Sequence, residues 1–320
     1  LIKDDEYNTF VASSSDPFGY NHFAGTGSGQ YGLGQTELAQ VAAGASDTVK
    51  AASWNSLLAG IDNIANHTND SMTARGQVTA GDPIKIKSAV AADLATLAAS
   101  VAGGCTSATA LTESSELRSA AASARFSATH IVEHSVTFAN GNNLRFFFNA
   151  GGKIRIKLTR TGNGGSSATD KDASVDELIT ALGNFDIGAQ VSTRSGSGET
   201  LQTDGLANGV DDFGTSYTTI AVIRQSSGTY TTMDLKIEGK VDNATYGSAV
   251  KVTIKCSVID ADSGDDQFTD GNTSGVDQFA NFIGVTDWGL FTVNPTTAQG
   301  LNPVYDISAS AIESNNVANG

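Results

Sequence analysis

The sequence contains few charged residues, few aromatic residues and little cysteine or proline. Charged residues make up 17% of the 320 positions and aromatics 7%, with 4 prolines and 2 cysteines. The 19 basic residues are outnumbered by 34 acidic ones, and a net charge of −15 makes nucleic acid and anionic membranes unfavourable partners. The Ala-rich run at residues 89–101 is too short to span a bilayer, and Asp93 interrupts it. Cys105 and Cys256 allow one disulfide that their spacing does not decide, and we interpret both as small buried hydrophobic residues.

The chain is rich in glycine and in short polar residues placed between apolar runs. Glycine occurs 35 times, and hydrophobic residues make up 39% of the chain. This composition is typical of a β-rich protein with many turns, stabilised by backbone pairing and by stacking against neighbours. It favours a structural protein over an enzyme. The length allows two or three domains with cores of their own.

Residues 1–128 are expected to form an Ala-rich helical module. Apolar side chains recur at helical spacing over residues 53–64, after Ser53 as a candidate N-cap, and again over residues 88–101. A third helix is expected over residues 113–125. Because these helices offer small side chains rather than a large apolar core, we expect an attachment module that is ordered by contact with other chains. The glycine-rich segment at residues 25–35 is expected to lie against a neighbouring subunit.

Residues 129–262 are expected to form a mainly antiparallel sheet or sandwich with one inserted helix, which makes the chain an α+β protein. The helix is expected to begin after Ser174 as N-cap and to end at Gly183, and residues 225–228 are expected to form a hairpin loop. Residues 263–320 are expected to be an irregular extension with one strand near residues 290–293. The strands of the sheet are expected at residues 131–138, 153–160, 217–224, 229–238 and 250–259.

The most specific feature of the chain is the segment FFFNAGGKIRI, which begins at Phe146. After the Asn-Ala-Gly-Gly turn, Ile154 and Ile156 alternate with basic residues, and this period of two predicts a half-buried strand. Residues 140–145 favour caps and turns. We therefore expect a strand, a short aromatic helix or turn, and a second strand, with the three phenylalanines packed in the core.

This segment resembles an element of virion structural proteins from tailed phages, especially the contractile-tailed phages of marine and cyanobacterial hosts. The chain departs from that pattern by having YGLGQ at residues 31–35, where GYGQ is usual, and nothing after Asp260 matches. The resemblance implies membership of a virion and supplies no catalytic residues. The other matching segments, in the same order as in those proteins, are Tyr7-Asn8, the glycine-rich segment 25–35, Ala52-Ser53-Trp54-Asn55 and Gly81-Asp82-Pro83-Ile84.

Three motifs invite a chemical interpretation, and each has a simpler one. Residues 27–32 match G-x-G-x-x-G but lack the preceding strand and the following helix of a dinucleotide site. Residues 260–275 are acidic, but Asn281 stands where a calcium loop has its twelfth-position Glu, so we interpret a solvated loop. His130 and His134 would lie about 13 Å apart on one face of a strand, too far for one metal ion.

We therefore expect no catalytic, cofactor-binding or metal-binding residues and no cofactor. The leading hypothesis is a structural component of a phage virion, in the tail, fibre or baseplate, that forms a homo-oligomer and assembles with other virion proteins. The alternatives are an adhesin that binds a host-surface glycan and a polysaccharide-degrading tail enzyme. The enzyme would need two convergent acids in a cleft. The adhesin would need exposed aromatics among Phe268, Phe279, Phe282, Trp288 and Phe291.

Overall fold

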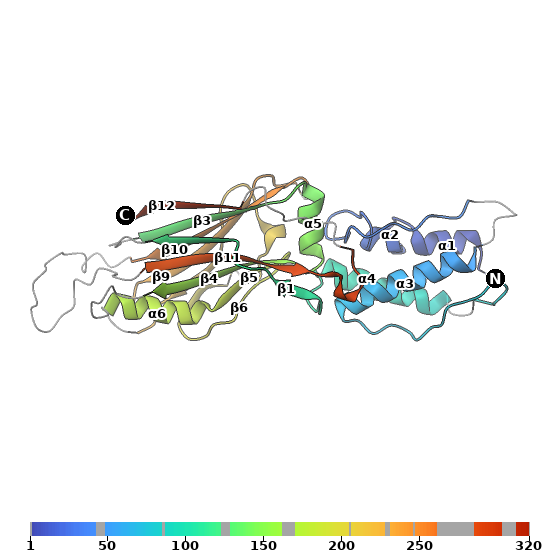
Figure 1. Ribbon diagram of the computed structural model, residues 1–320, viewed down its shortest axis with the longest axis horizontal. Helices are drawn as coiled ribbons and strands as arrows, with labels where there is room; N and C mark the ends of the chain where they lie inside the picture. Colours follow the sequence, from blue (N-terminus) through green and yellow to red (C-terminus); the bar gives the residue numbers. More distant parts are fainter. Residues whose placement is uncertain are drawn as a thin grey trace, which may run out of the picture.

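A helical part and a β-sandwich lie end to end along the long axis of the molecule (Figure 1). The N-terminus lies at the helical end, and the last strand lies in the sandwich. Within the residues described, no helix is long and apolar enough to cross a membrane. The structure, a computed structural model, describes residues 2–42, 49–84, 87–122, 129–161, 170–204, 206–227, 231–245, 247–260, 285–302 and 312–319.

The helical part contains α1 (Asp4–Val11), α2 (Tyr20–Phe23), α3 (Ala51–Thr68) and α4 (Lys87–Ala102). Helix α3 begins after Lys50, so Ser53 lies in its first turn and is not the expected N-cap. Helix α4 ends as expected, because Gly104 takes a left-handed φ of +70° and its N–H bonds the carbonyl of Val101. The buried face of α3 contains, among others, Trp54, Leu57, Leu58, Ile61 and Ile64.

These helices bury an apolar core within the chain, contrary to what their small side chains led us to expect. Trp54 and Phe23 are fully buried, and the ring of Phe10 lies 6.1 Å from that of Trp54. Small residues contribute to this core because they let neighbouring helices pack close together. A Cβ on Gly60 of α3 would lie 2.8 Å from the ring of Tyr20, so only glycine lets α2 pack here.

The described strands form two antiparallel sheets, and the expected α+β class is confirmed. The first sheet has the order β1-β11-β4-β5-β6, with β2 also paired to β11, and the second has the order β12-β3-β10-β9-β8-β7. The strands of the first sheet are β1 (Leu111–Glu113), β2 (Arg118–Ala122), β4 (Lys153–Thr161), β5 (Asn184–Ile187), β6 (Ser192–Arg194) and β11 (Val285–Pro295). Those of the second are β3 (Thr129–Thr137), β7 (Thr200–Asp204), β8 (Thr218–Arg224), β9 (Asp234–Val241), β10 (Lys251–Ile259) and β12 (Ile312–Asn319).

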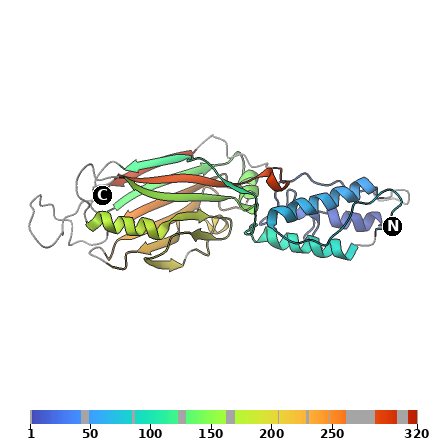
Figure 2. The ribbon, with the colours of Figure 1, turned by 60° about the horizontal axis from the view of Figure 1, so that its bottom comes forward.

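Two helices border the sheets (Figures 1 and 2). Helix α5 (Gly141–Asn149) covers the end of the sandwich that faces the helical part, and α6 (Asp170–Leu182) lies beside β4 and β8. Asn140 caps α5 as expected, since its side chain accepts a hydrogen bond from the N–H of Asn143 at 2.9 Å. Helix α6 ends at Gly183 as expected but starts before Ser174, which is buried inside it. The short helices η1 (Val210–Asp212) and η2 (Thr297–Gln299) complete the elements.

The phenylalanine segment and the strand after it fold as predicted. Phe146, Phe147 and Phe148 are all buried on α5, and the ring of Phe147 lies 5.3 Å from that of Phe138. Along β4, Ile154 and Ile156 are fully buried, and the basic residues that alternate with them lie on the opposite face. Strands β8 and β9 pair antiparallel, as the hairpin prediction requires.

The helix expected over residues 113–125 is not formed where the structure describes that segment, whereas the strand expected near residues 290–293 is confirmed as part of β11. Strands β1 and β2 occupy the region where a helix was expected, because pairing with β11 overrides the helical preference of the Ala-rich segment Arg118–Ala122. The C-terminal region supplies β11 and β12, one to each sheet, so it belongs to the sandwich, which also begins before residue 129. The strand expected over residues 229–238 is β9, which runs from Asp234 to Val241.

Candidate functional site

The glycine-rich segment is a tightly hydrogen-bonded loop at the joint between the helical part and the sandwich. The N–H of Gly32 bonds the carbonyl of Phe23 and the N–H of Gly34 bonds that of Gly25, both at 3.0 Å. Gly32 has a left-handed φ of +98°, and a Cβ there would lie 2.9 Å from the guanidinium of Arg145. The loop therefore lies against its own chain, where we expected a neighbouring subunit.

Arg145 and Asn149 of α5 hold this loop. They are four residues apart, so both project from one face of the helix. The guanidinium of Arg145 donates to the carbonyl of Thr26 at 2.6 Å and to that of Tyr31. The side-chain amide of Asn149 donates to the carbonyls of Tyr31 and Gly32 at 3.1 Å each. Both side chains are buried, with Arg145 only 4% exposed.

The polarity of the loop is opposite to that of a nucleotide-binding loop. Phosphate loops direct backbone N–H groups at an anion, whereas this loop directs carbonyl oxygens at the cation of Arg145. The loop also follows helix α2 rather than a strand, and no helix starts at Gln35. Its G-x-G-x-x-G spacing thus serves close packing between the two parts of the chain.

A second contact across the joint comes from His67, in the last turn of α3. Its Nε2 lies 2.7 Å from the carbonyl oxygen of Ala150, directly after α5, and its own carbonyl accepts the N–H of Thr109 at 3.0 Å. The imidazole is fully buried. Burial lowers the pKa of His67, and the hydrogen bond to Ala150 opposes that shift.

The chain crosses the joint again after β11. The segment beyond this strand forms η2, which packs on α3, and Asn302 then exchanges two hydrogen bonds with the side chain of Gln35, at 2.9 and 3.0 Å. The side chain of Gln190, from the loop between β5 and β6, donates to the carbonyl of Ala102 at the end of α4. Several separate segments therefore fix the helical part to the sandwich.

A cavity of about 120 Å³ lies between the end of α4, the turn before β4 and the β5–β6 loop. Its walls include Gly104, Gly151 and Gly188, and its charged residues are Lys153 and Asp186, whose charged atoms lie 3.9 Å apart. A cavity of this size, with one loose ion pair, offers no convergent set of acids or bases for catalysis.

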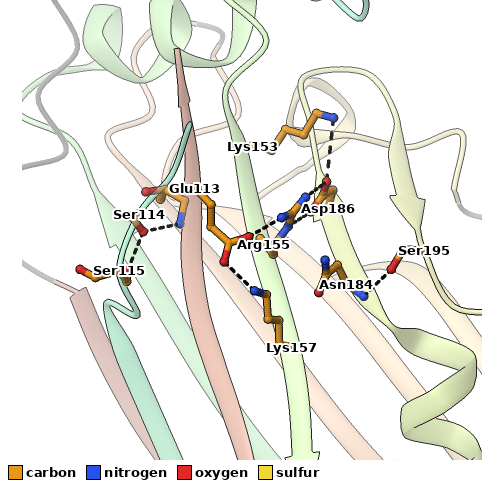
Figure 3. A network of polar contacts seen from close by, with 10 residues as sticks. Glu113, Ser114, Ser115, Lys153, Arg155, Lys157, Asn184, Asp186 and Ser195 are labelled. Carbon is orange, nitrogen blue, oxygen red and sulfur yellow. Dashed lines mark hydrogen bonds and ion pairs between the residues drawn. The ribbon is translucent and has the colours of Figure 1, made fainter. Parts of the chain in front are cut away.

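The outer face of the first sheet carries a network of ion pairs (Figure 3). Arg155 forms a two-point contact with Asp186, at 2.6 and 2.7 Å, and also pairs with Glu113. Lys157 binds Glu113 at 2.5 Å, and its ammonium lies 4.3 Å from the ring centre of Phe291. The hydrogen bond from Lys157 is the main cause that lowers the pKa of Glu113. The basic residues predicted to face outward on β4 thus each have an acidic partner within the chain.

The outer face of the second sheet has a similar network centred on Tyr217. Its hydroxyl donates to Glu133 at 2.6 Å, and the ammonium groups of Lys240 and Lys255 each lie 4.2 Å from its ring centre. Burial, and then the bond to Glu133, raises the pKa of the tyrosine. Glu238 completes the network by pairing with Lys255 at 2.5 Å.

Several of the other residues considered from the sequence are buried structural residues. Cys105 and Cys256 are free and buried, as interpreted, and burial raises the pKa of both thiols. His130 and His134 lie on one face of β3 and are fully buried. In the ranges that the structure describes, no group of three or more His, Cys, Asp or Glu side chains could hold a metal ion.

The acidic segment 260–275 and Asn281 lie outside the described residues, except for Asp260, which is buried. The same holds for Phe268, Phe279 and Phe282. Of the remaining C-terminal aromatics, Trp288 is fully buried and Phe291 lies beneath Lys157. These two rings are therefore not open platforms for a sugar.

Comparison with known protein families, with curated proteins and with solved structures gives no match for this chain.

Proposed function

We propose that this protein is a structural, non-enzymatic component of a bacteriophage virion, associated with its tail, fibre or baseplate. It acts by assembly with copies of itself and with other virion proteins. The main support for this proposal is the contact between two sequence segments at the joint. The two most specific segments of the resemblance, the glycine-rich loop and the segment that begins at Phe146, lie against one another there through Arg145 and Asn149.

A shared structural purpose explains why these two segments occur together. The loop supplies carbonyl oxygens and α5 supplies buried donors. Without the other segment, each would leave buried polar groups without a hydrogen-bond partner. The result is an elongated, two-part body whose parts are held in one orientation. Such a body transmits position and force along its length, which is what a subunit of a tail or fibre needs.

The outer faces of the sandwich support the same role. The charged side chains of both networks are already paired within the chain, as in Arg155 with Asp186 and Lys255 with Glu238. Covering a charge that already has its partner costs less free energy than covering an isolated one. These faces are therefore suited to lie against neighbouring subunits.

Assembly of the purified protein tests this proposal. Sedimentation velocity and chemical cross-linking, with and without the other virion proteins, should detect a homo-oligomer or a stable complex with those proteins. A chain that stays monomeric and binds no virion protein would contradict the proposal.

The same preparation distinguishes the alternatives. It is incubated with host capsule, lipopolysaccharide and cell-wall fractions, and released sugars are analysed by chromatography. Release that disappears when a single Asp or Glu is replaced would establish an enzyme. Binding of these fractions without release would establish an adhesin.

A further inference from the structure

His67 combines full burial with a single hydrogen bond across the joint. Its Nε2 lies 2.7 Å from the carbonyl oxygen of Ala150, which can only accept, so Nε2 carries the proton of the neutral ring. The other ring nitrogen, Nδ1, is buried and has no hydrogen-bond partner among the described groups. A proton added at Nδ1 would create a buried cation with an unsatisfied N–H.

The surroundings offer this cation little compensation. From α3 and the two residues after it come the negative end of the helix dipole and Asp70, whose carboxylate already accepts the hydroxyl of Thr68 at 2.7 Å. From the segment after α4 comes Cys105, whose thiol is neutral because burial raises its pKa. The charged groups elsewhere at the joint include two cations, Arg145 on the loop carbonyls and Lys153 beside Asp186. Burial is the larger cause acting on His67 and lowers its pKa from 6.5.

We propose that the joint is an acid-sensitive hinge, in which protonation of His67 uncouples the helical part from the sandwich. The proposal rests on the geometry of the joint and not on a place in the virion. The closed joint favours the neutral ring, so its stability is complete above pH 6.5 and falls as the pH decreases. The opening constant rises by up to about tenfold per pH unit below 6.5, until His67 is also protonated in the closed joint.

Hydrogen exchange measured by mass spectrometry tests the hinge at pH 7.5 and pH 5.0, after correction for intrinsic exchange rates. The reporters are the amides of Thr109, bonded to the carbonyl of His67, and of Asn302, bonded to the side chain of Gln35, because both lie on segments that connect the helical part to the sandwich, between α4 and β1 and after β11. Amides of β10, which is paired on both sides, serve as the reference. The matched variant is His67→Gln, whose amide can donate to Ala150 but does not titrate in this range.

In the wild type, the two reporter amides should lose protection by up to about 30-fold between pH 7.5 and 5.0, while β10 stays protected. The loss should be absent in His67→Gln. An equal loss in both proteins, no loss in the wild type, or a parallel loss in β10 would overturn the hinge. If the variant does not fold, NMR titration of the His67 ring in the wild type tests the hinge instead. A ring that titrates at pH 6.5 or above would overturn the hinge. Neither assay involves assembly, so failure here would leave the proposed function untouched.

Discussion

Replacing Arg145 with Met should weaken the joint substantially. Met keeps most of the length of the side chain and its contact with Phe146, whose ring centre lies 4.7 Å from the guanidinium carbon. The substitution removes the charged donor to the carbonyls of Thr26 and Tyr31. The carbonyl of Tyr31 keeps the amide of Asn149, so the main loss is at Thr26.

The magnitude follows from these contacts. A hydrogen bond to a charged group contributes about 1.5–3 kcal/mol, and a buried carbonyl left without a donor costs about 1–3 kcal/mol. Removing the buried charge offsets part of this loss of stability, because the cost of desolvating the guanidinium also disappears. We expect a net loss of about 2–4 kcal/mol in the free energy of unfolding of Arg145→Met.

Urea unfolding followed by tryptophan fluorescence measures this loss. Trp54 reports on the helical part and Trp288 on the sandwich, and Trp→Phe variants separate their signals. The matched control is Arg224→Met, which removes an ion pair with Asp234 from a side chain that is 42% exposed and should cost less than about 1 kcal/mol. If Arg145→Met costs no more than the control, the loop carbonyls do not hold the joint and our reasoning is refuted.

Three further predictions concern the sandwich and the cysteines. Phe147→Ala should lower the free energy of unfolding by about 2–5 kcal/mol, because its ring is fully buried, and unchanged denaturant midpoints would contradict this. Glu113→Gln should cost less than about 1 kcal/mol at pH 7. Because the folded pKa of Glu113 lies below 4.5, its contribution is present above pH 4.5 and should vanish as the pH falls through the folded value, so urea midpoints of the variant and the wild type should converge in acid. Cys105 and Cys256 should resist iodoacetamide until the chain unfolds, as mass spectrometry can show, and rapid labelling of the native protein would contradict their burial.

The elements with strong local periodicity were predictable from the sequence. The apolar stripe of α3 and the alternation of β4 come from neighbours within a few residues, and the structure follows both. The cap of α5 is equally local, since Asn140 acts on Asn143. Local signals failed where a distant partner decides the structure, as for β2, whose Ala-rich residues become a strand through pairing with β11.

The joint was not predictable in the same way, because its side-chain contacts connect residues that are 83 to 267 positions apart. Thr26 and Arg145, for example, are 119 residues apart. Two signals were available without being recognised. Arg145 stands beside three consecutive phenylalanines and shares a helix face with Asn149, and His67 continues the buried stripe of α3 after Ile64. A polar residue on an apolar face predicts a buried contact, but not its partner.

The central claim, that this chain is a built-in part of a phage particle, is tested most directly by locating it in intact virions. Under this proposal, particles of the source phage should be purified, and the protein should be quantified in them by mass spectrometry and localised by antibody labelling in the electron microscope. We expect a constant copy number per particle, with label confined to the tail, fibre or baseplate. A protein found in infected cells but absent from purified particles would contradict the account.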